Sequence, residues 1–166
     1  MKIMELIEMI DSTLKYSSTA AIQASDISPI LFRGDICSSI VKSKKYGFDA
    51  IEIHILRPDK IEVSKISEYC LKNNIIISTL GTGMSYTIDG LSLTDPDKLK
   101  REMAMERLKK YIELAEKFNS GVIIGSMRGK IDFADFNKYL SIYKENLMKL
   151  TDYAEYKSVS LYLQER

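Results

Sequence analysis

The chain has 166 residues, enough for one domain with a hydrophobic core, and 45% of them are hydrophobic and 28% charged, as in globular proteins. Its 24 basic and 23 acidic residues give a formal net charge of +1, which argues against a nucleic-acid partner or an anionic membrane surface. No apolar run is long enough to span a membrane. We interpret Cys37 and Cys70 as small buried hydrophobic residues, and we expect a cytoplasmic location.

The predicted elements begin with an amphipathic helix over residues 1–14, where acids interrupt apolar residues that recur at helical spacing. After it, short apolar segments alternate with longer segments of helical periodicity. The run Ile75–Gly81 is continuously apolar at its start, which is typical of a strand buried on both faces. The five expected strands lie within Lys15–Ala24, Asp49–Leu56, Ile75–Gly81, Gly121–Gly125 and Ser158–Gln164.

A helix is expected between each pair of consecutive strands, and polar residues mark where several of them begin. We place Asp35 near the N-cap of the first of these helices and Asp132 at the N-cap of the last. The third is expected to begin at Pro96, with Thr94 or Asp95 as its cap. This strict alternation predicts an α/β fold with a parallel sheet and right-handed crossovers. An open doubly wound sheet and the first part of a (β/α)8 barrel both fit the pattern.

Two glycine-rich stretches follow predicted strands. "GTG", residues 81–83, lacks the third glycine of a dinucleotide-binding turn, and no helix is expected directly after it. "GSMRGK", residues 125–130, is one residue short of a phosphate-binding loop and has Ile131 where Ser or Thr would bind magnesium. A simpler interpretation is a loop that presents Arg128 and Lys130 to an anionic or polyhydroxyl ligand, and the alternative is a solvated basic turn.

Glu52 and His54 are two residues apart on a predicted strand, so their side chains point the same way, into the interior. Burial of an acid and an imidazole costs several kcal/mol unless the groups are paired or functional. His54, the chain's single histidine, lies near the end of the strand where barrel enzymes build their sites. We therefore predict that His54 faces a ligand; the alternative is a core histidine with a hydrogen-bonded neighbour. At the end of the last strand, the carboxylate of Glu165 is suited to metal binding or proton transfer, and the alternative is an exposed chain end.

Five stretches together resemble one protein family. They read "SPILFRGD" (28–35), "GFDAIEIHI" (47–55), "RPDKIEVSKI" (57–66), "LGTGMSYTIDGLSLTDPD" (80–97) and "VIIGSMRGK" (122–130). This text is similar to the sugar phosphate isomerase/epimerase family, the xylose-isomerase-like TIM barrels that include ketose 3-epimerases and hydroxypyruvate isomerase. The resemblance implies a (β/α)8 barrel, of which this chain holds about the first five strands with their helices. We expect one incomplete domain over residues 1–166, with 1–14 as an extra helix and 15–166 as the barrel portion.

The resemblance also implies a divalent metal, which is manganese, magnesium, cobalt or zinc, held by residues on the fifth to eighth strands. In such enzymes a proton moves at the carbon next to a ketose carbonyl, which the metal polarises. One of those ligands can be mapped here, and it falls on Gln164 without a gap or on Glu165 with a shift of one. We assign Glu165 as the catalytic and metal-binding residue. The expected substrate-binding residues are His54, Gly81, Arg128 and Lys130.

The sequence therefore predicts a metal-dependent sugar or sugar phosphate isomerase or epimerase. Because most of the family's metal ligands have no counterpart here, we expect the chain to be inactive alone. One alternative is a non-catalytic half-barrel that binds a ligand or partner. A less favoured alternative is a zinc phosphodiesterase of the apurinic endonuclease kind, which uses several histidines. The expected partners are a small sugar and further copies of the chain, since a partial barrel leaves its sheet edges open to pairing.

Overall fold

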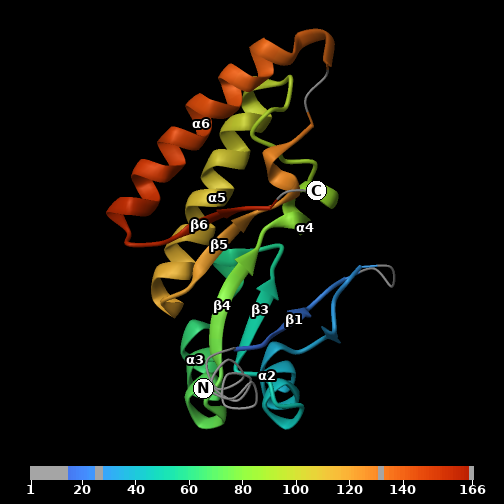
Figure 1. The fold of residues 1–166 in the computed structure, drawn as a ribbon, viewed down its shortest axis with the longest axis vertical. Coiled ribbons are helices and arrows are strands. Elements are labelled where there is room, and N and C mark those ends of the chain that lie inside the picture. Colours follow the sequence, from blue (N-terminus) through green and yellow to red (C-terminus); the bar gives the residue numbers. More distant parts are fainter. Residues whose placement is uncertain (1–14, 25–27, 131–132, 165–166) are drawn as a thin grey trace, which may run out of the picture.

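The computed structural model describes residues 15–24, 28–130 and 133–164, so the expected N-terminal helix, Asp132 and Glu165 lie outside the described residues. The described chain forms one parallel sheet in the order β2-β1-β3-β4-β5-β6, as an α/β fold requires (Figure 1). The strands are β1 (Ser17–Ala21), β2 (Phe32–Arg33), β3 (Ala50–His54), β4 (Ile76–Gly81), β5 (Gly121–Ile124) and β6 (Leu161–Leu163).

Helices connect consecutive strands from β2 onward, and short 3-10 turns lie in the connecting loops. The helices are α2 (Ile36–Lys45), α3 (Val63–Asn73), α4 (Gly83–Thr87), α5 (Lys98–Phe118) and α6 (Phe136–Tyr156). The 3-10 turns are η1 (Pro58–Lys60), η2 (Ser126–Arg128) and η3 (Phe133–Asp135). The helices α5 and α6 pack side by side along one end of the sheet, and α2 and α3 pack together at the other (Figure 1). None of the described helices is long and apolar enough to cross a membrane.

The helix starts confirm one of the expected caps and correct another. The carboxylate of Asp35 accepts a hydrogen bond of 2.7 Å from the backbone N–H of Ser38, as an N-cap residue does. For α5 the expected cap was wrong, because Asp97 takes this role and accepts from the N–H of Leu99 at 2.8 Å. Asp95 instead accepts from the N–H of Asp97 at 2.9 Å, and this turn precedes the helix. Two short elements, β2 and α4, were not predicted.

The two faces of the sheet differ in what covers them. The helices cover the face that carries Ile51 and Ile53 of β3, and both side chains are fully buried there. On the opposite face, called the pocket face below, Ile76 of β4 pairs with Ala50 and remains 59% exposed. The expectation that Ile75–Gly81 is buried on both faces is therefore wrong, because the described helices pack against one face of the sheet.

A register shift between β3 and β4 arranges the pocket face. Ile51 pairs with Ile77, but Glu52 pairs with Thr79, so Ser78 is an extra residue in β4. An extra residue of this kind is a β-bulge, and it reverses the direction in which the following side chains point. As a result Leu80 enters the core beneath the helices, and Gly81 lies opposite His54.

Candidate functional site

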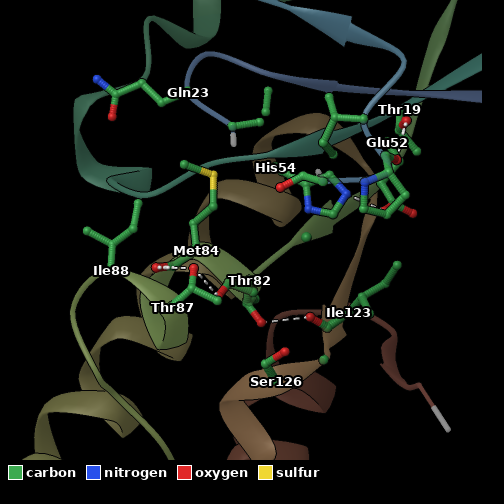
Figure 2. Close-up of a pocket in the computed structure, with 18 of the residues that line it drawn as sticks. Thr19, Gln23, Glu52, His54, Thr82, Met84, Thr87, Ile88, Ile123 and Ser126 are labelled. Carbon is green, nitrogen blue, oxygen red and sulfur yellow. Dashed lines mark hydrogen bonds and ion pairs between the residues drawn. The ribbon is translucent and has the colours of Figure 1, made fainter. Parts of the chain in front are cut away.

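A pocket of about 700 Å³ opens at the carboxyl ends of the parallel strands (Figure 2). Ligand sites of α/β proteins lie at this edge, because the loops that follow the strands converge there. Residues from β1, β3, β4 and β5 and from the loops after them contribute to the lining. The polar lining residues are Thr19, Gln23, Ser28, Glu52, His54, Thr82, Thr87, Ser126 and Gln164.

Glu52 and His54 form the one ion pair within the described part of this lining. The Nε2 atom of His54 lies 2.6 Å from Oε1 of Glu52, and the hydroxyl of Thr79 donates to Oε2 of Glu52 at 3.0 Å. The two side chains are 24% and 22% exposed, so both are partly shielded from water and open to the pocket. The two side chains point to the same side of the sheet, as predicted. His54 both has a hydrogen-bonded neighbour and lies at the pocket, so the two interpretations of this residue are compatible.

The surroundings of Glu52 keep it ionised at neutral pH. Burial raises the pKa of this carboxyl. Three interactions lower the pKa by more than burial raises it: the hydrogen bond from His54, the charge of His54 and the hydrogen bond from Thr79. The pKa of Glu52 therefore lies below its ordinary value. With both carboxylate oxygens bonded, the Glu52 side chain is held in one position. It in turn holds the imidazole ring of His54 at the pocket.

Gly81 lines the pocket beside His54, and the absence of a side chain there has a steric reason. A Cβ atom at Gly81 would lie 2.5 Å from Nδ1 of His54, closer than Cβ atoms approach other heavy atoms. The imidazole therefore lies flat against the backbone of β4. Gly81 creates the space for His54, and its predicted contact with substrate stays a prediction.

Arg128 and Lys130 do not line the pocket. The guanidinium of Arg128 donates from Nη1 to the backbone carbonyl of Gln164 at 2.9 Å. The hydroxyl of Thr94 donates to the carbonyl oxygens of Arg128 and Lys130, at 3.1 and 3.3 Å. The N–H of Gly129 donates within the loop, to the carbonyl of Ser126 at 3.0 Å. The Thr94 bonds tie the loop to the segment before α5, and the Arg128 bond ties it to the residue after β6. The predicted substrate contacts of its two basic side chains stay predictions.

Gln164 lies in the pocket lining, just beyond the end of β6. A Cβ atom at Gly125 would lie 3.5 Å from the side-chain oxygen of Gln164, which is an ordinary contact distance. Of the two positions considered for the strand-five ligand, the structure thus places Gln164 at the pocket, and Glu165 lies outside the described residues. The catalytic and metal-binding assignment of Glu165 stays a prediction.

The described residues do not fit the divalent metal that the resemblance implies. They contain no group of three or more His, Cys, Asp or Glu side chains placed to hold a metal ion. Glu52 and His54 bond each other, and the amide of Gln164 is neutral and a weaker ligand than a carboxylate for a hard cation. No step through a metal is derived from this site.

The short helix α4 forms a wall of the pocket that sequence reasoning missed. Met84, Thr87 and Ile88 gather on one side of the pocket, across from Thr19 and Glu52 (Figure 2). The wall continues below α4, where the hydroxyl of Thr82 donates to the carbonyl of Ile123 on β5 at 2.9 Å (Figure 2).

A buried polar network holds α4 in place. The guanidinium of Arg107 on α5 donates from Nη1 to the carbonyl of Leu56 at 2.8 Å, the hydroxyl of Ser85 at 3.1 Å and a carboxylate oxygen of Asp89 at 2.9 Å. The hydroxyls of Ser85 and Tyr111 are 3.1 Å apart. Burial raises the pKa of Tyr111 to about 12, so the phenol stays protonated. A sequence signal was available, since Arg107 interrupts the apolar stripe of an amphipathic helix.

Comparison with known proteins relates this fold to sugar epimerases. The apo structure of 3-keto-D-glucoside 4-epimerase YcjR from E. coli is 13% identical, with a TM-score of 0.67, over 90% of this chain and 56% of that chain. D-allulose 3-epimerase from Methylomonas sp., in complex with D-allulose, is 19% identical, with a TM-score of 0.66, and the match covers 90% of this chain and 50% of that chain. D-psicose 3-epimerase from Clostridium cellulolyticum H10, with D-tagatose, is 19% identical, with a TM-score of 0.65, and the match covers 89% of this chain and 51% of that chain.

At these identities the solved structures establish the fold. The chain spans about half the length of each of them, so the described sheet corresponds to part of a TIM barrel. No curated protein matches the chain. The model of one family, described as the xylose isomerase-like TIM barrel, matches residues 40–165. The match covers well over half of the chain and includes β3 to β6 with the Glu52–His54 pair. The chain belongs to the xylose isomerase-like TIM barrel family.

Proposed function

We propose that this chain supplies the sugar-binding portion of an isomerase or epimerase, with a ketose held against Glu52 and His54. The observation that carries the proposal is this ion pair in a pocket at the carboxyl edge of a parallel sheet. The three solved structures with the same fold are epimerases, and two of them contain a ketose. That likeness supports the proposal for this chain.

The roles of the two residues follow from their hydrogen bonds. In the proposal, the ionised carboxylate of Glu52 accepts the Nε2–H of His54 and fixes the tautomer and the orientation of the ring. When the imidazole is neutral, Nδ1 carries a lone pair and can accept a hydrogen bond from a sugar hydroxyl or take its proton. Thr79 supports the pair from below by its bond to Glu52.

Chemical turnover is a separate part of the proposal. Glu165 is assigned to move the proton next to the ketose carbonyl, and the family's further metal ligands have no counterpart in this sequence. We therefore propose that the chain alone binds ketoses and turns them over slowly or not at all. The zinc phosphodiesterase alternative is not favoured, because His54 is the chain's single histidine.

Calorimetric titration with D-fructose, D-tagatose and D-allulose tests the binding step. We expect millimolar binding of at least one ketose, and binding about tenfold weaker in His54→Gln, which removes one well-placed hydrogen bond worth about 1 kcal/mol or more. Lys72→Gln, on the exposed surface of α3, is the matched control and should bind as the unchanged chain does. If none of the three ketoses binds, the proposal is wrong.

Solvent exchange tests the turnover step. The chain is incubated with each ketose in D2O, with and without MnCl2, and NMR follows deuterium at the carbons next to the carbonyl. We expect no exchange above the enzyme-free rate. Exchange that depends on manganese and is lost in Glu165→Gln would show that the chain is catalytic, and it would exclude the half-barrel that only binds a ligand.

A further inference from the structure

The charges around the pocket are one-sided. Among the described lining residues, Glu52 is the one carboxylate and His54 the one imidazole, and neither lysine nor arginine is among them. The low pKa of Glu52 keeps its negative charge at neutral pH. An anionic ligand in this pocket would therefore meet a fixed negative charge, and among the described lining residues only a protonated His54 would offset it.

Two of the arginines near the mouth of the pocket are bonded to backbone oxygens of the protein. Arg33, in β2, donates to the carbonyls of Ile30 and Ser28, at 2.8 and 2.9 Å. Arg128, after β5, donates to the carbonyl of Gln164 at 2.9 Å. These bonds hold the loops that flank the pocket, and they direct both guanidinium groups to the protein.

Two further arginines share one carboxylate. Arg57, after β3, lies 2.7 Å from Oδ2 of Asp89, and Arg107 lies 2.9 Å from the same oxygen. Lys130 is exposed and lies outside the lining. Among the described residues, neither these four arginines nor Lys130 lines the pocket.

The neutral part of the lining suits a ligand with many hydroxyl groups. The hydroxyls of Thr19, Thr82 and Thr87 donate to backbone carbonyls, at 3.3, 2.9 and 3.3 Å, and keep acceptor lone pairs. Ser126 adds a further hydroxyl, and the side-chain amides of Gln23 and Gln164 carry both donors and acceptors. The apolar side chains of Met84, Ile88, Ile123, Pro29 and Ile30 provide surfaces for C–H groups. A sugar presents both kinds of surface.

We infer that this pocket selects an uncharged polyhydroxyl ligand, a free ketose, and discriminates against the same sugar carrying a phosphate or carboxylate. The inference rests on the proposed function and names the substrate class of that site. A phosphate ester brings a charge of about −1.5 to −2 at neutral pH. Desolvating that charge next to an ionised carboxylate, with no arginine or lysine among the described lining residues to pair with it, is unfavourable.

The test compares matched sugars. Calorimetry measures the affinities of D-fructose, D-tagatose and D-allulose and of their 6-phosphates at low ionic strength, where charge effects are least screened. We expect each free ketose that binds to bind at least about tenfold more tightly than its phosphate. Glu52→Gln should narrow this ratio, because it removes the fixed charge while it leaves the shape of the side chain.

Lys72→Gln, on the exposed surface of α3, is the matched control, and it should leave the ratio of the two affinities unchanged. A phosphate that binds as tightly as its free ketose overturns the inference and leaves the sugar pocket standing. Selective loss of phosphate affinity in Lys130→Gln overturns it as well, since the loop after β5 would then supply the phosphate contact. If neither the ketoses nor their phosphates bind, the proposed function fails together with the inference.

Discussion

Gly81→Ala provides a sharp test of the geometry around His54. The added methyl group would lie 2.5 Å from Nδ1 of the imidazole, and an ordinary contact requires about 1 Å more. The ring is confined on its other edge by the 2.6 Å bond to Glu52, so it cannot move away from β4 without straining that bond. We therefore expect the substitution to displace the ring and weaken the ion pair.

Two opposing effects set the magnitude. Overpacking of this kind costs about 1–3 kcal/mol, and a weakened charge-assisted hydrogen bond of partly exposed groups adds about 1 kcal/mol. The unfolded chain loses conformational freedom when Gly becomes Ala, which returns about 0.4–1 kcal/mol. The net expectation is a loss of about 1–3 kcal/mol in the free energy of unfolding.

Gly83→Ala, in the same "GTG" stretch, is the matched control. A Cβ atom at Gly83 meets nothing within 4 Å, and the residue begins α4, where Ala is favoured over Gly. Its stability should be unchanged or slightly raised. Urea denaturation measures both variants, and NMR of the imidazole reports His54 without ambiguity, because it is the chain's single histidine. Equal midpoints for the two variants, with an unshifted His54 signal in Gly81→Ala, would refute the reasoning.

Three further predictions concern other groups of the fold. Arg107→Ala should lower the free energy of unfolding, measured by urea denaturation, by about 2–4 kcal/mol, because it leaves Asp89 without its mostly buried partner. Arg57→Ala should lower it by less than about 1 kcal/mol, since the Arg57 side chain is 48% exposed. Equal losses in the two variants would contradict the described network. The lowered pKa of Glu52 stabilises the fold above about pH 4.5, and this stabilisation is lost as the pH falls through the pKa of Glu52 in the folded chain. The difference in free energy of unfolding between the unchanged chain and Glu52→Gln should therefore shrink in acid. A difference that does not vary with pH would contradict this prediction. The open edges of the described sheet, β2 and β6, predict self-association in sedimentation experiments, and a monomer at every concentration would contradict it.

Much of the site was predictable because it depends on local patterns. A spacing of two residues on a strand places Glu52 and His54 on one face of any parallel sheet, and the alternation of elements places His54 at the carboxyl edge. Their partnership was not predictable. The 2.6 Å bond depends on rotamers that the surroundings select, and Thr79, which completes it, comes from a different strand.

The basic loop shows a different kind of limit. From the sequence of residues 125–130, contact of Arg128 and Lys130 with a ligand was as plausible as their exposure to solvent. Composition does not show which way a side chain points. In the folded chain Arg128 reaches the carbonyl of Gln164, thirty-six residues further along the sequence. A contact of such sequence separation is decided by packing, and the same holds for Arg107, which reaches back to Leu56.

The sequence by itself determined the α/β class, the strand positions and the face on which Glu52 lies, because helical and strand periodicities are properties of neighbouring residues. It also carried the family, through short stretches that are spread along the chain. The tertiary structure alone decided the register of β4. If Ser78 paired with Glu52 in an unbulged strand, Leu80 would lie opposite His54, whereas the bulge turns Leu80 into the core and places Gly81 opposite His54 instead. Both registers satisfy the hydrogen bonds of a parallel sheet, so the burial of one leucine and the room needed by one imidazole made the choice.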